Sequence, residues 1–254
     1  MHARYIFTAT LALLAITHTT PAFANDEEPV DSPEEEGIIT DRPDVAESSR
    51  TVGKYRTQLE IGVDVDSNDT TALAIPTKLR FGLTDSFEVH VESDLIDATF
   101  GDDGSTGLST FDVGGKYHIS ENEGLPSLGL LLALELPTAE GAESLILHPT
   151  FAADFDLGAS FGLGTNLGLS VPLTEQAGQD PSLRYAASLG YGIGDLGLYA
   201  ELSGERTFGD AFGLVFDGGF AYGLSPTMQL DGYVRAGIKD APGVGGGLGF
   251  SIKI

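Results

Sequence analysis

Apolar and polar residues alternate one by one along most of the chain from residue 54 onwards. In residues 54–66, one set of alternate positions holds Tyr, Thr, Leu, Ile and Val, and the other holds Lys, Arg, Gln, Glu, Gly and Asp. Successive side chains of a β-strand point to opposite faces. The segment is therefore expected to be a strand with one apolar face and one polar face.

This alternation occurs in twelve segments, and the charged residues of those segments all fall on the polar faces. Most connections alternate between short turns and longer loops, which is typical of an up-and-down barrel. Pro76 and Pro149 lie inside strands, where we expect bulges or a strand portion above the membrane. The remaining segments are 73–83, 87–95, 111–119, 128–136, 145–157, 161–171, 183–193, 196–203, 212–224, 228–238 and 247–254.

Three features indicate that the apolar faces point outwards to lipid. The segments carry about 60 large apolar side chains, too many for the interior of a twelve-stranded barrel about 12 Å in radius. The polar faces are rich in Gly, Ser and Ala, and aromatic residues gather near the short turns, as in an interfacial girdle. The predicted fold is an all-β transmembrane antiparallel up-and-down β-barrel of 12 strands, with both termini periplasmic.

The polar faces would then line the lumen, with more acids than bases. A lattice of ion pairs across the wall is the expected role of these charges, and the acid excess favours cations over anions. The predicted pore-lining residues are Lys54, Arg56, Glu60, Lys78, Arg80, Glu88, His90, Glu92, Asp112, Lys116, Asp154, Arg184, Glu201, Asp217, Asp231 and Arg235.

The region before the strands divides into three parts. Residues 1–24 combine Arg4, a short apolar stretch and a small-x-small cleavage site, which predicts a signal peptide. Residues 25–36 are acidic and are expected to be disordered. Residues 37–53 form either a linker or a plug inside the lumen, where Asp41, Arg42 and Asp44 suit pairing with wall charges. Residues 54–254 form the transmembrane barrel.

The amino-acid composition of the chain excludes some classes of binding partner. The chain has 254 residues, a formal net charge of −25 and no cysteine, so it lacks the basic surface of a nucleic-acid binder and has no disulfides. Expected partners are outer-membrane lipid, small-molecule solutes, and the barrel-assembly machinery and periplasmic chaperones during export. We predict no cofactor and no metal, because a pair such as His90 and His118 lacks a third ligand.

Several short motifs resemble a known family. They are residues 40–44 (TDRPD), 58–60 (QLE), 76–83 (PTKLRFGL), 136–138 (LPT) and 218–237. The chain resembles the outer-membrane transporter family named for the meta-pathway of phenol degradation. It departs from the family pattern at Ala139, where Gly is usual, and at Ile254, where an aromatic residue is usual. The resemblance implies an outer-membrane channel for small, often aromatic or hydrophobic, compounds.

Two alternatives to a channel in the bacterial outer membrane remain. One is a non-conducting outer-membrane scaffold or surface-interaction barrel. The other is an outer-membrane lipid hydrolase, which needs a nucleophilic serine beside a histidine near the lipid-facing wall. The histidines after residue 24 are His90, His118 and His148, and all three fall on lumen-facing positions. We therefore do not expect an enzyme.

Overall fold

The computed structural model describes residues 37–254 except for 69, 102–103, 121–124, 140–141, 175–179, 210–211 and 242. The predicted signal peptide (1–24) and acidic tail (25–36) lie outside the described residues. Within the described part, no helix is long and apolar enough to cross a membrane.

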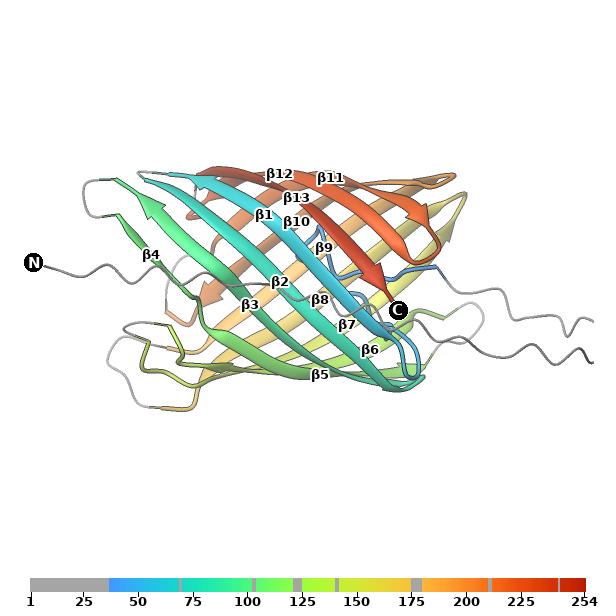
Figure 1. Ribbon diagram of the computed structural model, residues 1–254, viewed down its shortest axis with the longest axis horizontal. Helices are drawn as coiled ribbons and strands as arrows, with labels where there is room; N and C mark the ends of the chain where they lie inside the picture. The colour runs from blue at the N-terminus through green and yellow to red at the C-terminus, as the bar shows by residue number, and fades with distance from the viewer. Residues whose placement is uncertain are drawn as a thin grey trace, which may run out of the picture. The chain divides into compact units, whose positions relative to one another are not determined.

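Thirteen β-strands make one antiparallel sheet (Figure 1). Each strand pairs with the next one along the chain, with one exception. β4 pairs only with the C-terminal part of β3, and β5 pairs with the N-terminal part of β3 instead of with β4. The strands are β1 (Thr57–Ser67), β2 (Thr71–Thr84), β3 (Phe87–Phe100), β4 (Ser105–Gly107), β5 (Phe111–Ser120), β6 (Ser127–Leu136), β7 (Ile146–Gly158), β8 (Phe161–Pro172), β9 (Ser182–Ile193), β10 (Leu196–Thr207), β11 (Leu214–Ser225), β12 (Met228–Lys239) and β13 (Val244–Lys253).

The last strand closes the sheet on the first. β1 pairs with β13 from Gln58 opposite Lys253 to Ser67 opposite Val244. Beyond this ladder, Thr57 and Ile254 exchange two backbone hydrogen bonds of 2.9 and 2.7 Å, so the end of the chain lies beside the start of β1. Because β4 lies outside the closed ring, twelve strands form the wall. Each of the twelve wall strands that the structure describes therefore has a paired neighbour on both sides, as a sheet in lipid requires.

The wall is apolar on its outer surface and polar inside. On β2, Leu79 and Phe81 are 48% and 37% exposed, whereas Arg80 between them is 0% exposed. A soluble barrel would show the opposite distribution, since it buries its apolar face in the centre. The outward-facing apolar surface confirms the predicted transmembrane barrel. The largest fully buried side chains include Arg80, Lys116, Gln58, Glu60, Glu88, Glu201 and Asp231.

The first strand begins later than its alternation predicts. β1 starts at Thr57, and Lys54, Tyr55 and Arg56 are exposed in a turn before it. The turn uses left-handed backbone at Gly53 (φ 90°) and Tyr55 (φ 61°), which reverses the chain into β1. Apolar and polar residues thus alternate through residues 54–56 as well, although these residues precede β1.

The two prolines inside strands behave differently. At Pro76 the β2–β3 register shifts: Pro76 lies opposite Asp94 while Ala74 lies opposite Asp97. β3 therefore advances three residues while β2 advances two, which is a β-bulge. Pro149 lies opposite Leu132 with no register shift between β6 and β7. A short strand that the sequence did not predict, β4, also forms between the expected strand segments 87–95 and 111–119.

A cation on the outer face should destabilise the barrel according to its depth. Leu130 lies within β6 and is 50% exposed, and Leu157 lies near the end of β7 and is 54% exposed. Leu130→Arg should cost about 2–4 kcal/mol, and Leu157→Arg about 0–1 kcal/mol, because cost falls towards the interface. Urea unfolding of the barrel in phospholipid bilayers measures both costs, and equal costs would contradict a deeper position of Leu130 than of Leu157 in the membrane.

Candidate functional site

Residues 37–53, here called the lumenal segment, contact side chains that point inwards from several strands. The backbone N–H groups of Asp41 and Arg42 each donate to Glu60 Oε2 on β1 at 3.1 Å. Those of Val45 and Ala46 donate to the two carboxylate oxygens of Glu201 on β10 at 2.9 and 2.8 Å. Two inward-pointing glutamates thus each bind two successive peptide groups.

The remainder of the segment is held in the same way. Three further backbone N–H groups donate to side chains of the wall. That of Glu47 donates to Asn166 Oδ1 on β8 at 2.7 Å, and that of Ser49 donates to Asp154 Oδ2 on β7 at 2.8 Å. That of Val52 donates to Glu88 Oε2 on β3 at 2.8 Å. An irregular chain inside a barrel needs such partners, because a buried unpaired N–H is costly. Many of the lumen's acids therefore serve as acceptors for the segment's own backbone.

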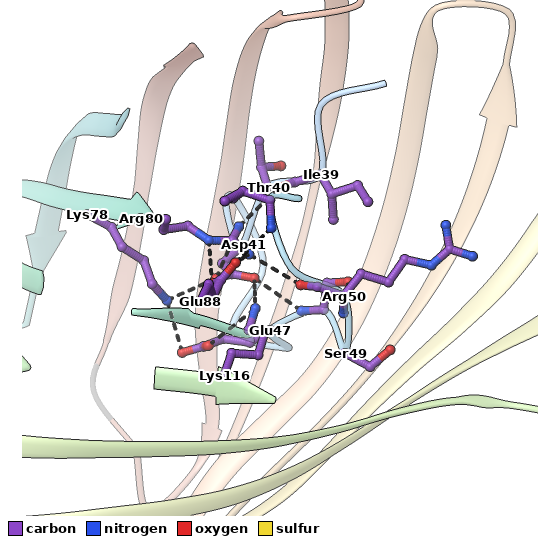
Figure 2. A network of polar contacts seen from close by, with 12 residues as sticks. Ile39, Thr40, Asp41, Glu47, Ser49, Arg50, Lys78, Arg80, Glu88 and Lys116 are labelled. Carbon is purple, nitrogen blue, oxygen red and sulfur yellow. Dashed lines mark hydrogen bonds and ion pairs between the residues drawn. The ribbon is translucent and has the colours of Figure 1, made fainter. Parts of the chain in front are cut away.

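Asp41 is the centre of an ion network between the segment and the wall (Figure 2). Its carboxylate lies 2.7 Å from Lys116 Nζ, 3.0 Å from Lys78 Nζ and 3.3 Å from Arg80 Nη1. Burial acts to raise the pKa of Asp41, but these three cations outweigh it and hold the pKa well below its usual range. Asp41 is thus charged and joins β2 and β5 to the segment. Glu47 adds a contact of 3.3 Å to Lys78.

Arg80 joins the same network to two wall carboxylates. Its Nε donates to Glu88 Oε1 at 2.9 Å, and its Nη1 donates to Glu60 Oε1 at 3.0 Å. The same guanidinium also donates to two backbone carbonyls of the segment, Ile39 O at 3.0 Å and Arg50 O at 3.3 Å (Figure 2). A planar group with five donors suits this number of partners.

Arg42 occupies space that two wall glycines leave open. Its guanidinium lies 3.4 Å from Asp64 and 3.5 Å from Asp231. A Cβ atom at Gly62 or Gly249 would lie only 2.4 or 2.6 Å from this guanidinium. Any larger residue at these two positions would therefore displace Arg42 from between its two acids.

Asp44 has acidic wall residues near it. Burial raises its pKa to about 7, although a hydrogen bond with Ser188 opposes the shift, and the nearby Asp217 adds to it. Of the three segment residues predicted from the sequence, Asp41 and Arg42 make ion pairs with the wall, while Asp44 lies beside Ser188 and Asp217.

The predicted pore-lining residues lie in different parts of the barrel. Lys54 and Arg56 lie in the exposed turn before β1. His90, Glu92, Asp112 and Arg184 line a cavity, and Asp217 and Arg235 line a second cavity of about 370 Å³. The residues that contact the lumenal segment are Glu60, Lys78, Arg80, Glu88, Lys116, Asp154, Glu201 and Asp231.

Several residues inside the barrel are not among the predicted pore-lining residues. Gln58 is buried and donates to Ile39 O at 2.8 Å, and the Asn166 amide donates to Glu47 O at 2.9 Å. Asp66 pairs with Arg235 through a hydrogen bond of 2.8 Å from Nε to Oδ1. Gln58 and Asn166 occupy inward-facing positions of the alternating pattern, and that position is the sequence feature that could have indicated them.

Free space remains along the glycine-rich wall of β8 and β9. Gly162, Gly164, Gly190 and Gly192 line a cavity of about 410 Å³, which also borders Asp154 and Ser188. Added Cβ atoms at Gly162, Gly190 and Gly192 would meet nothing closer than 3.7 Å. The lumenal segment thus leaves free space on this side of the lumen.

A closed antiparallel barrel with lipid-facing apolar residues and a charged interior is an outer-membrane β-barrel, here with its own N-terminal segment bound inside. The family follows from the sequence. The chain belongs to the family described as "Putative MetA-pathway of phenol degradation", whose model matches residues 40–254. This confirms the resemblance seen in the motifs.

Solved structures share the fold at low sequence identity. The COG4313 outer membrane channel from Pseudomonas putida F1 is 13% identical, with a TM-score of 0.65 over 81% of this chain and 98% of that one. The NanC porin is 12% identical, with a TM-score of 0.59 over 78% and 100%. The KdgM porin is 11% identical, with a TM-score of 0.55 over 76% and 98%. No curated protein matches the sequence.

Proposed function

We propose that the protein is a channel for passive passage of small molecules across the outer membrane, closed by the lumenal segment. The observation that carries the proposal is how the segment is held. Wall side chains bind its backbone, as Glu60 and Glu201 do, while the wall's own backbone is paired in the strand ladder. The segment can therefore leave the lumen without breaking the wall.

The chemistry of the open lumen follows from the same contacts. When the segment moves away, Glu60, Glu88, Asp154 and Glu201 lose the N–H donors that they accept now. Glu60 and Glu88 keep Arg80, and Lys78 and Lys116 lose Asp41 at the same time, so the carboxylates set free are Asp154 and Glu201. Free carboxylates in a narrow lumen favour cations over anions. Family membership makes small aromatic or hydrophobic compounds the first solutes to test. We also propose that both termini face the periplasm.

A non-conducting scaffold is the alternative, and the filled lumen is the observation that favours it. An enzymatic function is not part of the proposal. His148 does contact Ser170 at 3.1 Å, yet His148 and Ser170 both line a lumenal cavity. A membrane-lipid hydrolase needs its nucleophile at the lipid-facing wall.

Swelling of liposomes in graded solutes tests the channel. We expect low swelling rates with the full-length protein and clearly higher rates with a chain that starts at Lys54, because the shortened chain lacks the segment and the wall does not need the segment for its strand pairing. If the shortened chain folds and does not conduct, the channel is contradicted and the scaffold is favoured.

A point variant makes the same test within the whole chain. A Cβ at Gly129 would lie 2.7 Å from Ser49 O and 2.9 Å from Ser49 Cα, so Gly129→Ala pushes against the segment's backbone. We expect swelling between that of the full-length and shortened chains. Gly197→Ala is the matched control, because its Cβ would meet nothing closer than 3.7 Å and should leave swelling unchanged.

A further inference from the structure

Three acidic side chains lie side by side across neighbouring strands near the long-loop end of the lumen. Glu92 on β3 lies opposite Asp112 on β5, and Asp112 lies opposite Glu135 on β6. Like charges directly opposite one another in a sheet are destabilising. At one end of the row the cation Lys78 Nζ lies 3.4 Å from Glu92, and at the other end His148 Nε2 contacts Glu135 at 3.2 Å.

Asp112 lies in the middle of the row. Its Oδ1 atom is buried and has no hydrogen-bond partner among the residues that the structure describes. One ligand atom each from Asp112, Glu135 and His148 lie within 4.8 Å of one another, and all three residues are half-buried. One imidazole and two carboxylates therefore converge, and one buried carboxylate oxygen among them has no partner.

We propose that Asp112, Glu135 and His148 bind one divalent transition-metal ion of the Zn²⁺ class. Imidazole together with carboxylate is a ligand set of zinc sites, whereas Mg²⁺ and Ca²⁺ are bound through oxygen. Ser170 Oγ lies 3.1 Å from His148 Nδ1, where it can accept a hydrogen bond from Nδ1–H in the tautomer that leaves Nε2 unprotonated for the metal. The site does not depend on whether the barrel conducts.

The site borders a cavity that leaves room for a metal ion, and Arg184 competes with that ion for His148. Asp112, Glu135 and His148 border a cavity of about 530 Å³, which leaves open coordination positions for water or a solute donor. Zinc bonds of about 2.0–2.2 Å require ligand atoms about 3.4 Å apart, so the three side chains close in on binding. Arg184 Nη1 lies 3.3 Å from His148 Nδ1, and this exposed cation must swing away.

Calorimetric titration of ZnCl₂ into tag-free, metal-stripped full-length protein in detergent tests the site. We expect one high-affinity ion per chain and no comparable binding of Mg²⁺. His148→Ala and Glu135→Gln should each lower Zn²⁺ affinity at least about 100-fold, the upper limit for loss of an outer-shell partner. Arg184→Gln should raise the affinity, because it removes the competing cation.

His118→Ala is the matched control. His118 also faces the lumen, but its Nδ1 lies 3.3 Å from a backbone carbonyl, Ser49 O, and we expect unchanged Zn²⁺ affinity. Retention of the folded band in unheated gels confirms that each variant is a barrel. Wild-type protein that binds no Zn²⁺, or folded His148→Ala that binds it as tightly as wild type, would overturn the proposal. The second result would place the metal elsewhere, such as in the acidic residues 25–36.

Discussion

Replacing Arg80 with methionine is expected to destabilise the folded barrel by about 3–5 kcal/mol, the usual cost of removing one partner from a buried ion pair. Arg80 is fully buried, and so are Glu60 and Glu88, which it contacts. Methionine fills similar space and supplies no charge, so two carboxylates of the wall lose their nearest cation. Urea unfolding of the protein in phospholipid bilayers measures the loss.

The same substitution should loosen the lumenal segment. Arg80 donates to the carbonyls of Ile39 and Arg50 and contacts Asp41, so its loss removes three contacts that join the wall to the segment. Proteolysis of the segment in the folded barrel should become faster. Arg206→Met is the control, because Arg206 is exposed on β10 and should contribute less than about 1 kcal/mol. Equal effects of the two substitutions would contradict the central role of Arg80.

The wall could be predicted from the sequence because strand alternation is local information. On β6, Leu130 and Leu132 are about half-exposed while Leu131 between them is buried, as the two-residue period requires. A one-residue slip of a strand would turn its charged side chains to lipid and its apolar side chains to the lumen, so the pattern fixes which face points outwards. Where a turn such as residues 53–56 continues the alternation, the pattern extends beyond the strand itself.

The interior could not be predicted in the same way, because it depends on contacts between residues far apart in sequence. The excess of acids in the lumen was interpreted as favouring cations, yet Glu60 and Glu201 accept the backbone N–H groups of the segment. Gly62 and Gly249 make room for Arg42, which no property of a glycine in a single strand indicates. The cluster of Asp112, Glu135 and His148 likewise depends on the registers of three strands.

A cross-link between the lumenal segment and the wall should close the channel completely. A Cβ atom at Gly164 on β8 would lie 4.0 Å from the Cβ of Ala46, and disulfide-bonded Cβ atoms lie about 3.5–4.5 Å apart. The chain contains no cysteine, so Ala46→Cys with Gly164→Cys introduces the only two thiols. The added Cβ at Gly164 meets no atom closer than 3.5 Å, so the wall accepts the substitution.

Single-channel recording of this double variant in planar lipid bilayers tests the central claim most directly. The two single-cysteine variants are the controls, and both should open equally often with and without a reducing agent. The account predicts no openings from the oxidised double variant, with its cross-link verified by mass spectrometry, and openings at the frequency of the controls after reduction. Openings that persist while the cross-link is intact would show that solutes do not need the segment to move, and would contradict the account.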